Sequence, residues 1–265
     1  METSWLWLQR ELENTKGNVS CYFCNQDTGE TFSFQENYIH PSASVIKIFL
    51  MAYAHQLILE GKLKEDQFIS IHPDDLADSA GVLAYLSDVR KLSLRDLLEL
   101  MIIVSDNSAT NVLIRLLGME NVNTYLQDQG FTATRVRRRM MDFEARKQGL
   151  ENTTSAREAG EILERIYRGQ MVSIERDAAM LRTLSHQQDD SLIPFYLEEY
   201  INEHQIAHKT GGLDGVVHDA ALITGGGHPF ILCFMGSQVD VPSYSRKIAD
   251  WAKRIFLQVQ KETEE

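Results

Sequence analysis

The stretch PSASVIKIFLMAYAHQLIL (residues 41–59) marks the point where the chain changes from a strand pattern to a helical one. Before it, Val19 to Asn25 and Thr31 to Phe34 read as short β-strands, and the turn between them at Asp27–Gly29 is typical of a hairpin. From Ser44 to about Leu59 the pattern is helical, and Gly61 is placed to cap the helix. The first quarter of the chain therefore predicts two strands and then a long helix.

In the rest of the chain, helices come first and strands follow near the C-terminus. The middle reads as helices and loops, and the strand pattern returns near residue 205. Helices are expected at Ser93–Val104, at Asn111–Leu117 and, with a capping box of Ser155 and Glu158, at Ser155–Tyr167. Strands are expected at Gln205–Thr210, Val216–Thr224 and Phe230–Ser237, and a final helix at Ser243–Val259. A helix is also expected at the N-terminus, where Trp5, Leu8 and Leu12 have helical spacing.

Strands at both ends and helices between them predict an α+β fold. We expect one five-stranded antiparallel sheet, built from the two ends of the chain and flanked by the N- and C-terminal helices. Residues 1–43 and 200–265 would form this α/β lobe, and residues 44–199 an inserted all-helical lobe. Together they would be a single domain with a site at the interface between the lobes.

Charge and composition exclude several classes of partner. The formal net charge is -12, which repels phosphate backbones and anionic lipid, so no nucleic-acid partner is expected. We interpret the basic run Arg135–Arg139 as a solvated loop face, with binding of an anionic ligand as the alternative. No apolar run reaches the ~18 residues of a membrane span. The first residues lack the basic start of a secretory signal, which indicates a cytoplasmic protein unless a leader has been removed.

The cysteines predict neither a metal site nor a redox site. Cys21 and Cys24 form a CxxC inside a strand pattern, where positions three apart point to opposite faces. A metal site would need a loop and usually a second pair of ligands. We expect all three cysteines to be buried free thiols, and we expect no metal and no organic cofactor.

Three short motifs carry the chemistry. Ser44 and Lys47 lie one helical turn apart at the start of a buried segment, so the hydroxyl and the amine can touch. Ser105-Asp106-Asn107 follows a buried helix, and Lys209-Thr210-Gly211 ends a predicted strand. Serine is a weak nucleophile without a base, and a lysine can be that base only when neutral. At a normal pKa of ~10.4 fewer than about one lysine in a thousand is neutral at pH 7, but burial and the nearby cation Lys209 both favour the neutral form.

With these motifs the sequence resembles the class A β-lactamases and the related penicillin-recognising serine acyltransferases, whose motif set is Ser-x-x-Lys, Ser-Asp-Asn and Lys-Thr-Gly. The resemblance covers nearly the whole chain; residues 81–114 look like the family's central helices, and residues 208–224 look like its active-site strand and the strand that follows. It implies a β-lactamase/transpeptidase-like fold and an acyl-enzyme on Ser44, with Lys47 as base.

The resemblance also implies the roles of the other motif residues. The backbone N–H groups of Ser44 and Gly212 would stabilise the oxyanion, and Ser105 would pass a proton to the departing nitrogen. Asn107 would hold the substrate amide, while Lys209, Thr210 and Gly211 would bind the substrate carboxylate. His208, His218 and Asp219 flank the third motif, and we interpret them as structural.

One part of the family pattern is missing. Class A enzymes carry a loop glutamate that activates the water for deacylation, and its place in this chain falls near Met140 or Met141. Asp142 and Glu144 lie close by and are the candidates for that base. A general base contributes typically ~10²- to 10⁴-fold, so its loss would slow release of the acyl group while leaving acylation intact.

The leading hypothesis is therefore a monomeric serine hydrolase that opens β-lactam amides, acting on a small-molecule substrate. The first alternative is a D-alanyl-D-alanine peptidase or an esterase with the same machinery. The second is a slowly deacylating penicillin-binding sensor.

Overall fold

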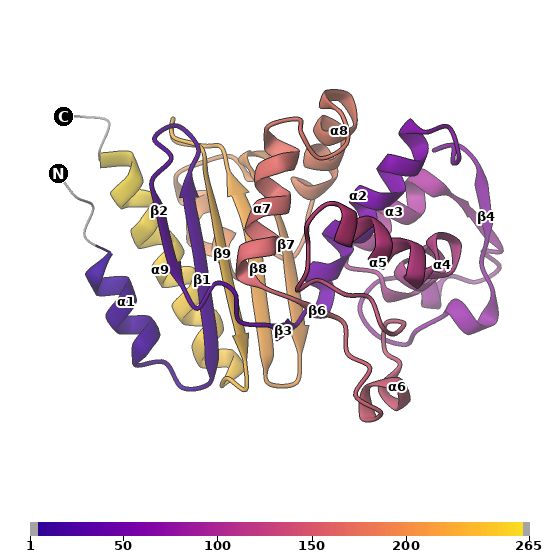
Figure 1. Cartoon of the computed structure of the whole chain (residues 1–265), viewed down its shortest axis with the longest axis horizontal. Helices are drawn as coiled ribbons and strands as arrows, with labels where there is room; N and C mark the ends of the chain where they lie inside the picture. The colour runs from indigo at the N-terminus through magenta and orange to yellow at the C-terminus, as the bar shows by residue number, and fades with distance from the viewer. Residues whose placement is uncertain (1–4, 262–265) are drawn as a thin grey trace.

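The computed structural model describes residues 5–261 and contains the expected five-stranded antiparallel sheet. Its strands are β1 (Asn18–Asn25), β2 (Thr31–Phe34), β7 (Ile206–Leu213), β8 (Val216–Ile223) and β9 (Phe230–Ser237). Their order is β2-β1-β9-β8-β7, so the N-terminal hairpin lies beside the C-terminal strands (Figure 1). This arrangement confirms the predicted α+β fold, and it leaves β7, which carries the third motif, at an edge of the sheet.

The two faces of the sheet are covered differently. Helices α1 (Leu6–Glu13) and α9 (Val241–Lys261) pack on one face, where Val19, Cys21 and Phe23 of β1 are buried. Tyr22 and Cys24 belong to the core on the opposite face. Cys21 and Cys24 therefore point away from each other, and they and Cys233 are buried free thiols, as predicted.

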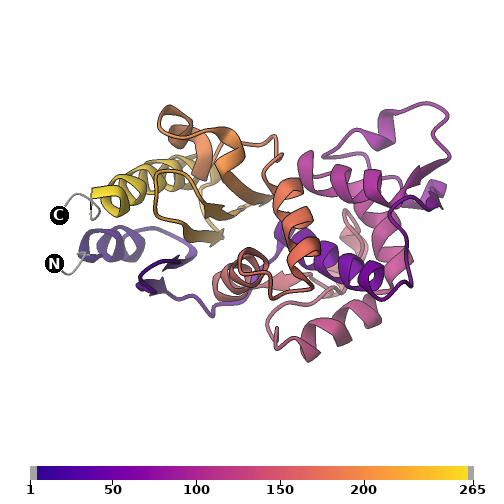
Figure 2. The same cartoon turned by 90° about the horizontal axis from the view of Figure 1, so that it is seen from above.

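The second core joins the other face of the sheet to the helices of the middle segment (Figure 2). Helix α2 (Ile46–Leu59) is central to it, because residues on every side of the helix from Ile46 to Ala52 are buried. The surrounding helices are α3 (Leu94–Ile103), α4 (Asn107–Leu117), α5 (Met119–Asp128) and α8 (Ile174–Leu184). Helix α7 (Ala156–Tyr167) also falls within residues 44–199, but it packs on β1, β8 and β9 of the sheet.

Short elements connect these layers. Strand β3 (His40–Pro41) pairs with β6 (Thr153–Thr154), and β4 (Phe68–Ser70) pairs with β5 (Lys91–Ser93). Helix α6 (Phe143–Lys147) is a short surface helix, and the 3-10 turns are η1 (Ala43–Val45), η2 (Pro73–Asp75), η3 (Leu83–Tyr85), η4 (Ile193–Glu199) and η5 (Glu203–Gln205). Within residues 5–261, no helix is long and apolar enough to cross a membrane.

Only one of the two hydrogen bonds of the predicted capping box is present at the start of α7. Ser155 caps the helix by accepting a hydrogen bond from the Glu158 N–H at 3.2 Å. The Glu158 carboxylate does not return to Ser155. It accepts the backbone N–H groups of Thr132, Ala133 and Thr134 at 2.6–2.8 Å instead. The glutamate thus fixes the loop that leads to the basic run, a tertiary role that local sequence does not reveal.

Candidate active site

Ser44 lies in a 3-10 turn, η1, immediately before helix α2, so it is not on the α-helix that carries Lys47. Several contacts fix this turn. Ser42 N–H donates to the Asn152 carbonyl at 2.8 Å, and Val45 N–H donates to the Ser42 carbonyl at 3.1 Å. Ala43 has a φ of 44°, a strained value for a residue with a side chain. Ser44 itself is half-buried, so solvent can reach it.

Two buried histidines hold the segment that leads into this turn. His218 Nε2 donates to the Pro41 carbonyl at 2.7 Å, and its Nδ1 accepts the Gly236 N–H at 3.1 Å. Burial lowers the pKa of His218 to about 4, although the hydrogen bond to Pro41 opposes that shift. His40 lies against the His218 ring and bonds to Ser20 and Ser237. Both imidazole rings are neutral at pH 7, and their hydrogen bonds hold the backbone before η1 in place. This agrees with the interpretation of His218 as a structural residue.

Lys47 is completely buried and bonds to the second motif. Its Nζ lies 2.7 Å from the Ser105 carbonyl oxygen, 3.0 Å from Ser105 Oγ and 2.8 Å from Asn107 Oδ1. Lys47 was expected to contact the Ser44 hydroxyl. Among the described residues, the hydrogen bonds of Lys47 Nζ go to Ser105 and Asn107 and not to Ser44. The first two motifs are therefore joined through Lys47 and Ser105, with Ser44 beside them in the same cavity.

The surroundings of Lys47 favour a neutral amine. Burial lowers the pKa of Lys47 well below its ordinary value, and the charge of Lys209 lowers it further. Asp106 acts in the opposite direction, but its carboxylate is already occupied by backbone N–H groups of Val82 and Leu83, at 2.6 and 2.7 Å, and of Ala109 at 2.8 Å. The groups that contact the Lys47 amine are neutral oxygens, which suits a base.

The middle residue of the second motif organises this turn, a role that the sequence analysis did not assign. Asp106 caps α4 and also holds the loop at residues 79–83. Gly81 permits this contact, because a Cβ there would lie 2.3 Å from the Asp106 carboxyl carbon. Ser105 has a φ of 53°, so it is held in a strained conformation that turns both its oxygens toward Lys47.

The third motif lies on edge strand β7, directly against the turn η1 that contains Ser44. A Cβ added to Gly211 would lie 3.1 Å from the Ser44 backbone nitrogen, so a side chain there would push the strand and the turn apart by a few tenths of an ångström. Gly212 lines the cavity, and a Cβ there would meet nothing nearer than the Val216 carbonyl oxygen at 4.0 Å. The strand thus brings a bare stretch of backbone to Ser44, as an oxyanion-binding role for Gly212 requires.

Lys209 is buried within a group of charges. Burial lowers the pKa of Lys209 to about 8, while Asp219 and Asp189 oppose that shift. Beside it, His208 lies 3.1 Å from Asp219 and 3.3 Å from Asp190. Burial alone would lower the pKa of His208, but the charge of Asp219 and the hydrogen bond with Asp190 raise it to about 9. His208 is therefore a buried cation that supports the strand.

The three motifs meet around one cavity of about 240 Å³. It is lined by Ser44, Ser105, Asn107, Thr210 and Gly212 from the motifs, together with Ala43, Ala80, Arg138, Met140, Met141, Phe143, Asp189 and Leu213. Residues from the sheet and from the helical segments both contribute, as an active site between lobes requires. Lys47 and Lys209 lie beneath its wall.

Neither candidate for the deacylation base lines this cavity. Asp142 caps helix α6 by accepting the Ala145 N–H at 2.9 Å. Glu144 is 78% exposed and pairs with Lys147 at 2.7 Å. The residue held at the cavity wall is Met140, whose backbone N–H donates to Asn111 Oδ1 at 2.8 Å and whose carbonyl accepts Asn111 Nδ2 at 3.3 Å. An apolar side chain thus occupies the place that the motif alignment gives to the glutamate.

The basic run is not the solvated loop face that we expected. Arg138 is only 4% exposed, lines the cavity and pairs with Glu151. Arg139 bonds Asp75 at 2.7 Å, and Arg135 donates to the carbonyls of Phe131 and Thr134. Arg135 braces its own loop, whereas Arg138 and Arg139 tie the loop to Glu151 and Asp75, contacts that a single sequence does not show.

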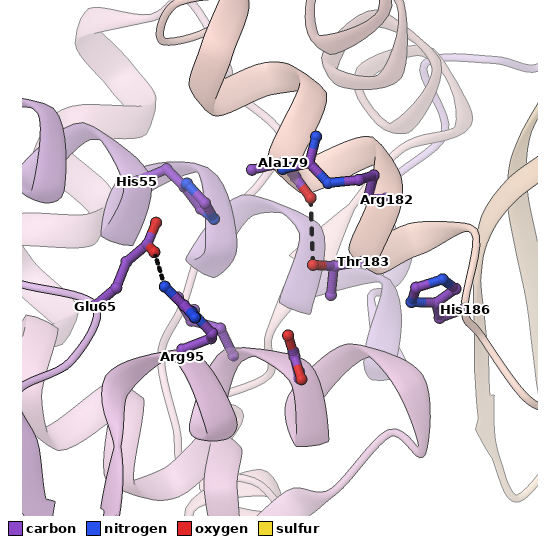
Figure 3. A pocket seen from close by; sticks show the side chains of 9 residues that line it. His55, Glu65, Arg95, Ala179, Arg182, Thr183 and His186 are labelled. Carbon is purple, nitrogen blue, oxygen red and sulfur yellow. Dashed lines mark hydrogen bonds and ion pairs between the residues drawn. The ribbon is translucent and has the colours of Figure 1, made fainter.

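A second cavity, of about 370 Å³, lies among helices α2, α3 and α8 (Figure 3). Its lining includes His55, Glu65, Arg95 and Arg182, and Arg95 donates to Glu65 at 2.7 Å. It contains no motif residue, and its principal acid is already paired with arginines. The described residues contain no cluster of histidine, cysteine and acidic side chains arranged to hold a metal ion.

Comparison with known proteins agrees with this geometry. The family model described as the β-lactamase enzyme family matches residues 7–257, nearly the whole chain. The chain belongs to this family. A stretch of 106 residues is 30% identical to β-lactamase BRO-1 of Moraxella catarrhalis, and it spans 39% of this chain and 34% of that relative.

Solved structures of similar proteins extend over the full fold. A β-lactamase from Sphaerobacter thermophilus DSM 20745 is 28% identical and has a TM-score of 0.86, with 97% of this chain and 98% of that chain covered. PBP-A is 25% identical and also has a TM-score of 0.86, with 98% and 95% covered. A leucine-to-glutamate mutant of PBP-A has been solved as an acyl-enzyme complex with penicillin G. This β-lactamase-family member therefore resembles both a β-lactamase and PBP-A.

Proposed function

We propose that the protein is a serine hydrolase that forms an acyl-enzyme on Ser44. The observation that carries this proposal is the single cavity in which Ser44, Ser105, Asn107 and Gly212 meet above the buried Lys47 amine. A neutral Lys47 supplies the base that a serine nucleophile needs. Two backbone N–H groups, those of Ser44 and Gly212, are the candidates for the oxyanion hole.

The acylation step can be written from these groups. Ser44 Oγ attacks the substrate carbonyl, and its proton passes to Lys47 Nζ. The tetrahedral oxyanion then collapses, the bond to the leaving nitrogen breaks, and the proton moves from Lys47 through Ser105 Oγ to that nitrogen. The 3.0 Å contact between Lys47 Nζ and Ser105 Oγ supports this relay. Lys47 is neutral again at the end of the step.

The substrate class that the family supports best is a β-lactam or a related amide. A D-alanyl-D-alanine peptidase or an esterase would use the same groups. The slowly deacylating penicillin-binding protein is favoured by a specific observation: Met140 lies at the cavity wall, while Asp142 and Glu144 lie outside the lining. Water that attacks the acyl-enzyme would then lack a carboxylate base from the loop that carries Met140, so we propose fast acylation and slow release.

Intact-mass measurement after mixing with benzylpenicillin tests this proposal. We expect a mass increase of one penicillin that persists after free drug is removed, and no such adduct in the Ser44→Ala variant. Rapid loss of the adduct with release of hydrolysed drug would instead indicate an efficient β-lactamase. An adduct that survives in Ser44→Ala would show that the nucleophile is another residue. Absence of any adduct, together with hydrolysis of small esters, would support the esterase.

A further inference from the structure

Asp189 is a cavity residue that belongs to none of the three motifs. It lies in the loop between α8 and η4 and faces the same cavity as Ser44 and Thr210. Among the described residues that line this cavity, the charged side chains are Asp189 and Arg138, and Arg138 is paired with Glu151. Asp189 is therefore the acidic side chain that a substrate meets in the lining of this cavity.

Asp189 interacts with two residues of the third motif, Thr210 and Lys209. Ser191 Oγ donates to Asp189 Oδ1 at 2.6 Å. Gln187 Nε2 donates to Thr210 Oγ1 at 3.2 Å, which leaves the Thr210 hydroxyl proton free to be donated to Asp189. Partial burial would raise the pKa of Asp189, but the hydrogen bonds from Ser191 and Thr210 and the charge of Lys209 hold it below the ordinary value. The carboxylate is charged at neutral pH.

This arrangement places a protein carboxylate where the proposed function places a substrate carboxylate. Thr210 and Lys209 are the groups assigned to bind that substrate charge, and both already interact with Asp189. Lys209 is also compensated by Asp219. A substrate carboxylate arriving at Thr210 would have to lie beside Asp189 and compete for the same donor, and like charges at such range repel each other.

We propose that Asp189 is a specificity-determining residue that disfavours substrates carrying a carboxylate at Thr210 and favours substrates that present a neutral hydrogen-bonding group there, such as an ester or an amide. This inference rests on the proposed acylation of Ser44. It narrows the substrate class, because among β-lactams and related amides those with an uncharged group at Thr210 would then acylate the protein faster.

A pair of substrates that differ only in this charge tests the inference. Acylation rates are measured by intact mass for benzylpenicillin and for its methyl ester, with the wild-type protein and with Asp189→Asn. The matched control is Asp190→Asn, because Asp190 is the adjacent carboxylate but bonds His208 and does not line the cavity. Both substitutions replace a carboxylate of the same loop with an amide, and only Asp189→Asn replaces one that lines the cavity.

We expect Asp189→Asn to accelerate acylation by benzylpenicillin about tenfold and to change the rate with the methyl ester by less than about twofold, as removal of one nearby like charge predicts. Asp190→Asn should leave the ratio of the two rates unchanged. An unchanged ratio in Asp189→Asn, or an equal change in both variants, would overturn the assignment while acylation of Ser44 stands. If neither compound labels Ser44 in the wild-type protein, the proposed function fails and the specificity inference fails with it.

Discussion

Replacing Gly211 with alanine adds one methyl group at the contact between strand β7 and the turn η1. The new Cβ would lie 3.1 Å from the Ser44 backbone nitrogen and 3.2 Å from both Ala43 Cβ and Val45 Cγ2. Normal van der Waals contact between such atoms is about 3.5–4.0 Å. Either the strand or the turn must therefore move by several tenths of an ångström.

The turn has little freedom to move. Its flanking residues are held by the Ser42 N–H bond to Asn152 at 2.8 Å and by the His218 bond to Pro41 at 2.7 Å. Ala43 and Val45 are buried, and the backbone of Ala43 is already strained. The substitution therefore acts as overpacking in a rigid region, which typically costs about 1–3 kcal/mol.

The same displacement shifts Ser44 relative to the oxyanion donors and to Ser105. Misplacement of a reacting group by 1 Å can cost about 10²-fold in rate, so a shift of several tenths should reduce acylation by about tenfold or more. We thus expect Gly211→Ala to lose about 1–2 kcal/mol of stability. Its acylation should fall even at temperatures where the protein is fully folded.

The assay combines urea unfolding with the rate of acylation by benzylpenicillin. Gly212→Ala is the control for stability, because its Cβ would meet only the Val216 carbonyl oxygen at 4.0 Å. We expect its unfolding free energy to stay within about 0.5 kcal/mol of wild type. The reasoning is refuted if Gly211→Ala is as stable as Gly212→Ala and acylates at the wild-type rate, since the turn would then yield freely.

Four further results are expected. Met140→Glu places a carboxylate at the cavity wall and should shorten the lifetime of the acyl-enzyme by about 10²-fold or more; an unchanged lifetime in time-resolved mass spectra would count against that position. Glu144→Gln should leave deacylation unchanged, because its carboxylate is 78% exposed and paired with Lys147; slower release would identify it as the base after all. Lys209→Ala removes a cation that lowers the pKa of Lys47, so the pH midpoint of acylation by a neutral ester should move upward; a downward shift would contradict the electrostatic assignment. NMR titration of the His208 ring should give a pKa of about 9 that falls toward 6.5 in Asp190→Asn. Since the folded state binds this proton more tightly, the stability that His208 contributes is complete below about pH 6.5 and is lost as the pH rises through about 9; urea unfolding of the two proteins with no difference in this window would contradict it.

The fold was predictable because the strands carry their own signals. Thr31–Phe34 and Phe230–Ser237 form strands at the predicted residues. The opposite orientation of Cys21 and Cys24 also followed from the two-residue period of a strand. The strand β7 was predicted too short, ending at Thr210 instead of Leu213, because glycines at 211 and 212 weaken a local strand pattern.

Several parts of the site were not predictable from local sequence. Asp189 comes to the cavity through a loop, and Asn111 fixes Met140 across 29 positions of sequence. Arg138 is buried through a partner 13 residues away. A motif search finds residues that are close in sequence, such as Ser105 and Asn107. The supporting contacts depend on how distant loops return to the same place, which only the folded chain shows.

The different roles of the two buried lysines follow from where the carboxylates lie. Lys47 bonds neutral oxygens of Ser105 and Asn107, and the nearest acid, Asp106, is occupied by backbone N–H groups. Lys209 has Asp219 and Asp189 nearby, and its pKa is lowered only to about 8.

Burial therefore disfavours the charge of Lys47, whereas the two nearby acids help to maintain that of Lys209, although both side chains are inaccessible to solvent. The positive charge of Lys209 disfavours protonation of Lys47. The negative charges of Asp219 and Asp189 offset the attraction of Lys209 for an anionic substrate group. In the proposed mechanism Lys209 would accordingly support the base at position 47 as well as bind the substrate. A substrate that brings its own carboxylate would disturb both functions, because it would favour protonation of both lysines.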